Sequence, residues 1–122
     1  MAEEKVVEIK DVESLEPGFG KSDLRVLHPL LGFEHLDFVI GIFPPEGDLP
    51  PHYHTHAEEL YYIYKGEITV HAGDRTYIAK EGTGVNVPPK VVHWPYNHTD
   101  KDCEVVFVLS PPEKEGDLVV TE

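Results

Sequence analysis

Cysteine and basic residues are both scarce in this sequence of 122 residues, and each scarcity excludes a class of site. Cys103 is the single cysteine, so the chain can form no internal disulfide and cannot build a thiolate metal site by itself. Lysine and arginine number 10 against 23 acidic residues, which gives a formal net charge of −13. Because this charge repels phosphate groups, we expect no nucleic-acid partner and no binding to anionic membranes.

Long hydrophobic runs are missing as well. The longest strongly apolar stretch, residues 38–43, is far too short to span a bilayer. The opening residues, MAEEKVVEI, contain no apolar core of the kind that marks a secretory signal peptide. We therefore expect a cytoplasmic protein with no membrane partner.

Amphipathic helical patterns are also lacking, whereas 11 prolines and 10 glycines divide the chain into short pieces rich in valine, isoleucine, tyrosine and phenylalanine. Short strands separated by turn residues are typical of an all-β sandwich or barrel. No linker or internal repeat interrupts them, so we expect residues 1–122 to form a single domain. The predicted strands are residues 6–12, 24–27, 36–43, 60–64, 67–72, 76–78, 85–87, 91–96, 104–109 and 118–121.

One stretch, residues 52–66, carries a concentrated set of potential metal ligands. His52, His54 and His56 occupy every second position, so in an extended strand their side chains share one face. Glu58 or Glu59 can join them after a bend. Imidazole with carboxylate is a ligand set for Zn, Fe, Mn or Ni rather than for thiolate-seeking metals. The alternative interpretation is a pH-sensitive or solvated surface loop.

Two spaced motifs resemble those of the cupin family. The family's first motif is commonly written G-x5-H-x-H-x(3,4)-E-x6-G, and His52, His54, Glu59 and Gly66 fall at its spacing. The second is commonly written G-x5-P-x-G-x2-H-x3-N, and the matching residues are Gly82, Pro88, His93 and Asn97. The motifs span about residues 47–66 and 82–97 and stand in the family's order, which makes the resemblance specific.

The sequence departs from the family pattern at two positions. Gly47 lies one residue too close to His52, and Lys90 stands where the second motif has its middle glycine. Glycine at that place permits a positive φ, so we expect the turn at Lys90 either to differ or to carry some strain. Neither departure removes a ligand.

The resemblance implies a single cupin barrel, a jelly-roll-like double-stranded β-helix, with one divalent transition metal (Fe, Mn, Zn or Ni). The implied metal ligands are His52, His54, Glu59 and His93. His56 shares the alternation of the first two histidines and is an alternative ligand. Residues expected to line the pocket around the metal are Phe38, Ile40, Tyr61, Ile63 and Phe107.

Several functions remain open for such a barrel. A metal-dependent enzyme acting on a small carbonyl, enol or diol-type compound is favoured, either an oxidoreductase of the dioxygenase type or an isomerase or lyase. The alternative is a non-enzymatic module that binds a metal or a small ligand; the absence of a helix-turn-helix pattern or a basic segment weighs against a DNA-linked sensor. Because terminal apolar strands leave edges to cover, and cupins commonly pair, we expect a homodimer.

Overall fold

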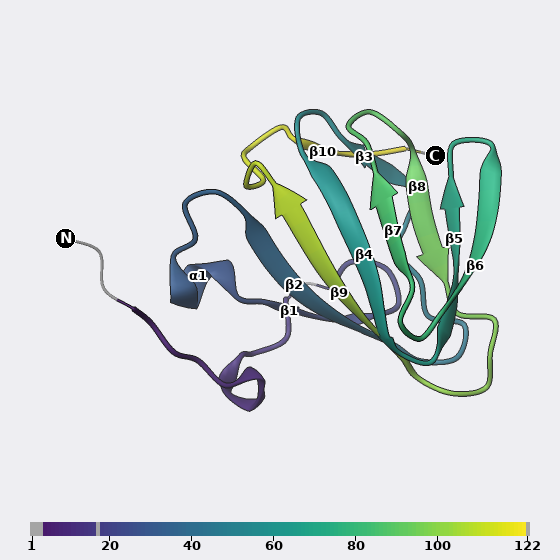
Figure 1. Cartoon of the computed structure of the whole chain (residues 1–122), viewed down its shortest axis with the longest axis horizontal. Helices are drawn as coiled ribbons and strands as arrows, with labels where there is room; N and C mark the ends of the chain where they lie inside the picture. The colour runs from purple at the N-terminus through teal and green to yellow at the C-terminus, as the bar shows by residue number, and fades with distance from the viewer. Residues whose placement is uncertain (1–3, 17, 122) are drawn as a thin grey trace.

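The computed structural model describes residues 4–16 and 18–121, and the regular structure in these residues is almost entirely β (Figure 1). None of the helices in these ranges is long and apolar enough to cross a bilayer. In chain order the elements are η1 (Ile9–Asp11), β1 (Asp23–Val26), α1 (His28–Leu31), β2 (Asp37–Phe43), β3 (His52–His54), β4 (Glu58–Lys65), β5 (Glu67–Ala72), β6 (Arg75–Lys80), β7 (Gly84–Val87), β8 (His93–Tyr96), β9 (Cys103–Ser110) and β10 (Leu118–Val120).

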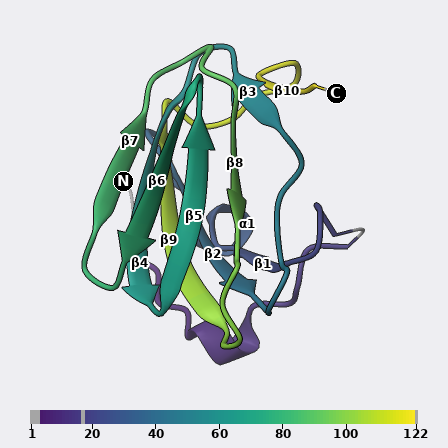
Figure 2. The same ribbon diagram turned by 90° about the vertical axis from the view of Figure 1, so that its right-hand side faces the viewer.

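The strands form two antiparallel five-stranded sheets that face each other (Figure 2). The first has the order β1-β2-β9-β4-β7 and the second the order β10-β3-β8-β5-β6. Among the described residues no strand ladder joins one sheet to the other. Consecutive strands repeatedly pass from one sheet to the other, which is the double-stranded β-helix arrangement that the motifs imply. The all-β, jelly-roll-like prediction is therefore confirmed.

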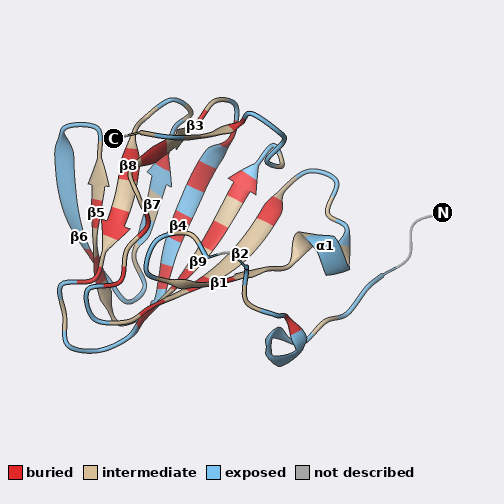
Figure 3. Ribbon diagram, turned by 180° about the vertical axis from the view of Figure 1, so that it is seen from behind, coloured by how far each residue is buried: buried red, intermediate tan, exposed pale blue. Residues whose placement is uncertain are grey.

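The core lies between the sheets because the inward positions of the central strands are apolar. Buried residues alternate with exposed ones along β4, and along β9 they alternate with partly buried ones, drawn tan in Figure 3. This two-residue period is what a sheet with one buried face requires. The buried apolar cluster draws on both sheets and includes Phe43, Tyr61, Ile63, Ile68, Val70, Val105 and Phe107.

The N-terminal strand prediction is wrong. Residues 9–11 form the short helix η1, and Val6 is 93% exposed. The segment alternates apolar and charged residues, but it joins no ladder. Strand β1 contacts this part of the chain through the isolated bridge between Ser14 and Arg25 and through the Arg25 side chain, which donates to the carbonyl of Val12 at 2.9 Å. Alternation alone does not make a strand when no neighbour supplies hydrogen bonds.

The turn at Lys90 keeps a left-handed conformation although the residue is not glycine. Lys90 has a φ of 69°, and its backbone N–H donates to the carbonyl of His54 at 2.7 Å. Side chains in this region of φ cost about 1–2 kcal/mol relative to glycine. The chain accepts this strain rather than altering the turn, and the hydrogen bond joins the two motifs next to a predicted ligand.

Candidate metal centre

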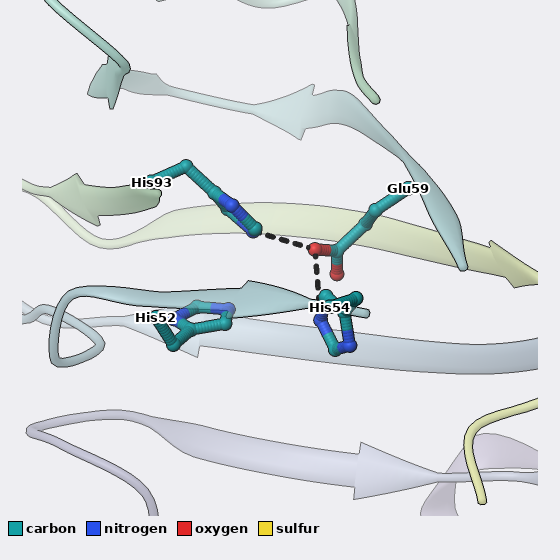
Figure 4. Close-up of side chains that lie close together, drawn as sticks. All are labelled: His52, His54, Glu59 and His93. Carbon is teal, nitrogen blue, oxygen red and sulfur yellow. Dashed lines mark hydrogen bonds and ion pairs between the residues drawn. The ribbon is translucent and has the colours of Figure 1, made fainter. Parts of the chain in front are cut away.

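Four buried side chains with ligating atoms meet between the sheets. His52, His54, Glu59 and His93 each offer one atom, and these atoms lie within 4.8 Å of one another. Figure 4 shows the four side chains pointing toward a common centre. Each is at most 5% exposed. The structure thus brings together the four residues that the cupin resemblance implies as ligands.

Three strands place these residues. His52 and His54 point inward from β3, Glu59 from β4 and His93 from β8. His52 and His93 are directly paired across β3 and β8, and their ring centroids lie 4.3 Å apart. Glu59 belongs to the opposite sheet, so the cluster spans the interior and joins the two layers.

Each histidine is held by its Nδ1 atom from outside the cluster. Nδ1 lies 2.7 Å from the carbonyl oxygen of Pro50 in His52 and 2.8 Å from that of Val91 in His93. In His54 it lies 3.0 Å from the carboxylate Oδ2 of Asp117. Acceptors at this position select the Nδ1–H tautomer, which leaves each Nε2 lone pair available for a metal.

The centre requires positive charge between the imidazoles and Glu59. Oε1 of Glu59 lies 2.9 Å from Nε2 of His93 and 3.5 Å from Nε2 of His54. Both nitrogens of each of these two rings therefore face oxygen acceptors, whereas a neutral imidazole can donate through only one nitrogen. Extra protons or a metal cation must supply the missing positive charge. A divalent metal fits this set of three nitrogens and one carboxylate.

The electrostatics keep two of the ligands ready to bind. Burial lowers the pKa of His52 to about 4, helped by the nearby His93, so its ring is neutral at pH 7. Burial acts to raise the pKa of Glu59, but the hydrogen bonds from His54 and His93 outweigh it and lower the pKa to about 2. A neutral imidazole and an ionised carboxylate are the forms that coordinate metals.

A cavity of about 520 Å³ opens onto the cluster. His52, His54 and Glu59 form part of its wall. Most of the remaining wall is apolar and comprises Leu15, Phe19, Leu24, Val26, Pro29, Val39, Leu49, Phe107, Leu109 and Leu118. His28, Asp37 and Glu113 add a polar group beside it. A ligand in this cavity would contact the cluster with one end and the apolar wall with the rest of its surface.

The predicted pocket residues fall into three groups. Phe107 lines this cavity. Tyr61 and Ile63 are fully buried in the core, with the ring of Tyr61 at 5.9 Å from that of His93. The prediction for Phe38 and Ile40 needs correction, because both line a separate cavity of about 490 Å³ on the other face of β2. The inward face of β2 instead carries Asp37, Val39, Gly41 and Phe43.

His56 and Glu58 lie outside the cluster. The chain bends after β3, so His56 no longer follows the alternation of His52 and His54 and is exposed. Its backbone N–H donates to Oδ1 of Asp117 at 2.7 Å. Glu58 is exposed on the face of β4 opposite Glu59. The geometry therefore favours Glu59 over His56 as the fourth ligand.

Asp117 is the site residue that the sequence did not reveal. Its carboxylate is buried, contacts His54 through Oδ2, and accepts the backbone N–H groups of His56 and Ala57 through Oδ1. The pairing of β10 with β3 places it there. No motif marks Asp117, and it stands 63 residues from His54. Its one signal in the sequence is an acidic residue directly before an apolar strand.

Comparison with known proteins agrees with this architecture. The family model for the cupin domain matches residues 39–109, which is more than half of the chain. Polyketide synthase CurC from Streptomyces cyaneus is 29% identical over 109 residues, which cover 88% of this chain and 70% of that protein.

Two solved structures share the fold. The polyketide cyclase RemF from Streptomyces resistomycificus superposes with a TM-score of 0.79 and 22% identity, over 97% of this chain and 85% of its own. A predicted oxalate decarboxylase from Thermotoga maritima gives a TM-score of 0.74 and 21% identity, over 87% and 98%. At these identities the structures establish the fold alone.

Proposed function

Because the chain belongs to the cupin family, we propose that it is a metal-dependent enzyme acting on a small carbonyl or enol compound with an apolar body. The reaction is of the isomerase, cyclase or lyase type, in which a carbonyl compound passes through its enol. The observation that carries this proposal is that the four-residue cluster lies at the wall of a largely apolar cavity. The names of CurC and RemF, both polyketide proteins, support the same substrate chemistry.

His52, His54, Glu59 and His93 would hold one divalent ion, Zn, Mn, Fe or Ni. When bound, such an ion supplies Lewis acidity that polarises a carbonyl oxygen. The chain itself orients the ligands and supplies a mostly apolar cavity. The acceptors at each Nδ1 fix the three rings, and apolar residues including Phe19, Leu49 and Phe107 line the cavity beside them. Low polarity strengthens every charge interaction that the site makes with the substrate.

Metal content is the first test. Protein purified without a chelating tag is expected to contain about one equivalent of a divalent transition metal per chain. His54→Ala should lose most of this metal and remain folded, whereas His56→Ala should keep it, because His56 lies outside the cluster. Elemental analysis and circular dichroism measure both properties. Metal retained in His54→Ala and lost in His56→Ala would contradict the assigned site.

The reaction type is tested with 2-tetralone, an apolar ketone whose α-hydrogens exchange with solvent through the enol. Metal-loaded protein in D2O is expected to accelerate deuterium uptake, followed by proton NMR, and His54→Ala is expected not to. Oxygen consumption by the Fe-loaded protein without such exchange would instead indicate a dioxygenase. Metal binding without turnover of either kind would indicate a non-enzymatic binding module.

The homodimer and the cytoplasmic location belong to the same proposal. The outward face of the first sheet presents apolar side chains from three neighbouring strands, including Ile40 of β2, Val106 of β9 and Tyr62 of β4. Tyr62 is 42% exposed and Leu60, on the same face, is 39% exposed. A second copy of this chain would cover these groups. With a single cysteine the chain forms no internal disulfide, and a cytoplasmic location is consistent with that.

A further inference from the structure

A histidine and an aspartate that take no part in the metal cluster line the same cavity. Nδ1 of His28 is buried and lies 3.4 Å from Oδ1 of Asp37. The Asp37 side chain is 6% exposed, whereas the His28 side chain is 40% exposed. His28 lines the cavity, so the part of its ring that is not buried is available on the cavity side.

His28 and Asp37 lie close enough to the metal cluster for one small substrate to contact both. Asp37 on β2 and Glu59 on β4 both pair with Leu109 on β9, from its two sides. The two carboxylates are therefore at the same level of the sheet and both point inward. Their strands are two spacings apart, which places their Cα atoms about 10 Å from each other. A substrate with one end at the cluster can present its other atoms to His28.

The surroundings hold both residues in place. Oδ2 of Asp37 accepts the backbone N–H of Glu113 at 2.7 Å. The backbone of His28 is fixed on both sides: Leu27 N–H donates to the Phe38 carbonyl at 3.0 Å, and Gly32 N–H donates to the His28 carbonyl at 2.7 Å. With Oδ2 already engaged, Oδ1 of Asp37 is the oxygen left for the imidazole.

We infer that His28 is a catalytic residue that transfers protons to and from the substrate, and that Asp37 is its positioning residue. This inference rests on the proposed function. Oδ1 of Asp37 is the acceptor nearest to Nδ1, so in this proposal the neutral ring carries its proton on Nδ1 and keeps the Nε2 lone pair for the substrate. The 3.4 Å separation is longer than a hydrogen bond, and catalytic contacts of this kind commonly shorten in the complex with substrate.

The proton transfer is balanced without a further reactant. Nε2 of His28 takes a proton from the carbon next to the substrate carbonyl, and the C–H electron pair forms the C=C bond of the enolate. The carbonyl π electrons move to its oxygen. The imidazolium is stabilised by Asp37 and then returns the proton to the same or another carbon. Return of the proton to another carbon completes an isomerisation. Solvent exchange follows when the proton on Nε2 is replaced by a deuteron from water before it is returned to the same carbon.

The test uses 2-tetralone in D2O with the metal-loaded protein. His28→Gln should lower the rate of deuterium uptake about 100-fold, which is typical for loss of a general base, and leave the metal content unchanged. The matched control is His35→Gln, because His35 is 90% exposed and lies outside the cavity. His35→Gln should exchange at the wild-type rate.

A second readout does not depend on turnover. In metal-free protein labelled with ¹⁵N, His28 should show the Nδ1–H tautomer, and Asp37→Asn should shift it toward Nε2–H by presenting an amide donor. Exchange that survives His28→Gln, or an Nε2–H tautomer in the wild type, would overturn the inference and leave the proposed function standing. Absence of exchange in the metal-loaded wild type would overturn the proposed function, and the inference with it.

Discussion

The three histidines of the cluster differ in the acceptor that contacts their Nδ1 atom. His52 and His93 are held by backbone carbonyls only two residues away in the chain, so any folded form of their own strands retains these contacts. His54 is held by the Asp117 carboxylate, 63 residues away. Burial acts to lower the pKa of His54, but Glu59, Asp117 and Glu113 outweigh it and raise the pKa. Asp117 is thus an anionic support that the other two rings lack.

Replacing Asp117 is expected to weaken metal binding without unfolding the chain. Outer-shell partners of ligating histidines typically contribute about 10- to 100-fold in metal affinity. Asp117→Asn should therefore raise the dissociation constant for Zn by about this factor, because a neutral amide supports the ring less well. Titration against a competing chelator measures the change.

The matched control for this substitution is Glu115→Gln. Glu115 is exposed and lies two residues from Asp117, and its substitution by glutamine removes the same charge. Its affinity should equal that of the wild type. Equal losses in the two variants would attribute the effect to overall charge and not to the contact with His54.

Cys103 is expected to be inert in the folded protein. It is fully buried, and burial, with smaller effects of Glu104 and Glu67, raises the pKa of its thiol to about 12. Because only the thiolate reacts, Ellman's reagent at pH 8 should label almost none of the native protein and one thiol per chain in guanidinium chloride. Rapid labelling of the native protein would contradict the burial.

The sign of the linked stability change follows from the same pKa. Above pH 9 the unfolded chain loses the thiol proton while the folded chain keeps it. The folded state then binds more protons, so this residue's contribution to stability falls as the pH rises from 9 to 12.

At the scale of whole elements, β2 shows how far sequence reasoning reaches. Its position and its burial were predictable from an apolar run bounded by turn residues. The face that turns inward was not, because both faces are apolar. Phe38, Ile40 and Ile42 form the more hydrophobic set, yet they point outward, and the set containing Asp37 and Gly41 points into the interior. The pairing register of β2 with β9 determines which face turns inward, and the hydrophobic periodicity of β2 does not reveal that register.

The cluster itself was predictable because the motifs supply spacing. Alternation places His52 and His54 on one face, and the second motif identifies His93 as the residue that meets them. Asp117 and the pair His28–Asp37 could not be found in this way. Each depends on contacts between segments far apart in the chain, and no local pattern reports which segments will meet.

On the inward face of β2, the packing at Gly41 leaves no room for a side chain. A Cβ at this position would lie 2.6 Å from the Phe107 ring and 2.9 Å from the Phe43 ring. Gly41→Ala should therefore destabilise the fold by about 1–3 kcal/mol, as overpacking of a close-packed core does. Urea unfolding measures the change.

Gly84→Ala is the comparison for this substitution, because its Cβ would meet nothing closer than 3.6 Å. It also lies in a strand, so the effect on backbone flexibility is similar. The prediction fails if the two alanine variants unfold at the same urea concentration.

For the whole molecule, the outward face of the first sheet is the candidate surface for a second copy. Phe38, Val108 and Leu60 form one row across β2, β9 and β4, and Ile40, Val106 and Tyr62 form the next. With a net charge of −13, most of the surface repels another copy. These two uncharged rows are where apolar contact can outweigh that repulsion.

Tyr62→Asp is expected to convert the proposed dimer to a monomer, because it places a charge within this apolar face. Sedimentation velocity at several concentrations measures the change. The control is Ile78→Asp, an equally disruptive charge on β6 of the other sheet, where Ile78 is 65% exposed. Ile78→Asp should remain dimeric. A wild type that sediments as a monomer would refute the assembly.

The contact between Asp117 and His54 has a consequence for how the protein is made. This contact joins residues 63 positions apart, so it can form only after Asp117 has been synthesised. A nascent chain that has emerged only as far as β9 holds the four ligands but has neither β10 nor the carboxylate behind His54. Full affinity for the proposed metal is therefore reached only after Asp117 has been synthesised, and a chain that stalls before this residue should bind the ion more weakly.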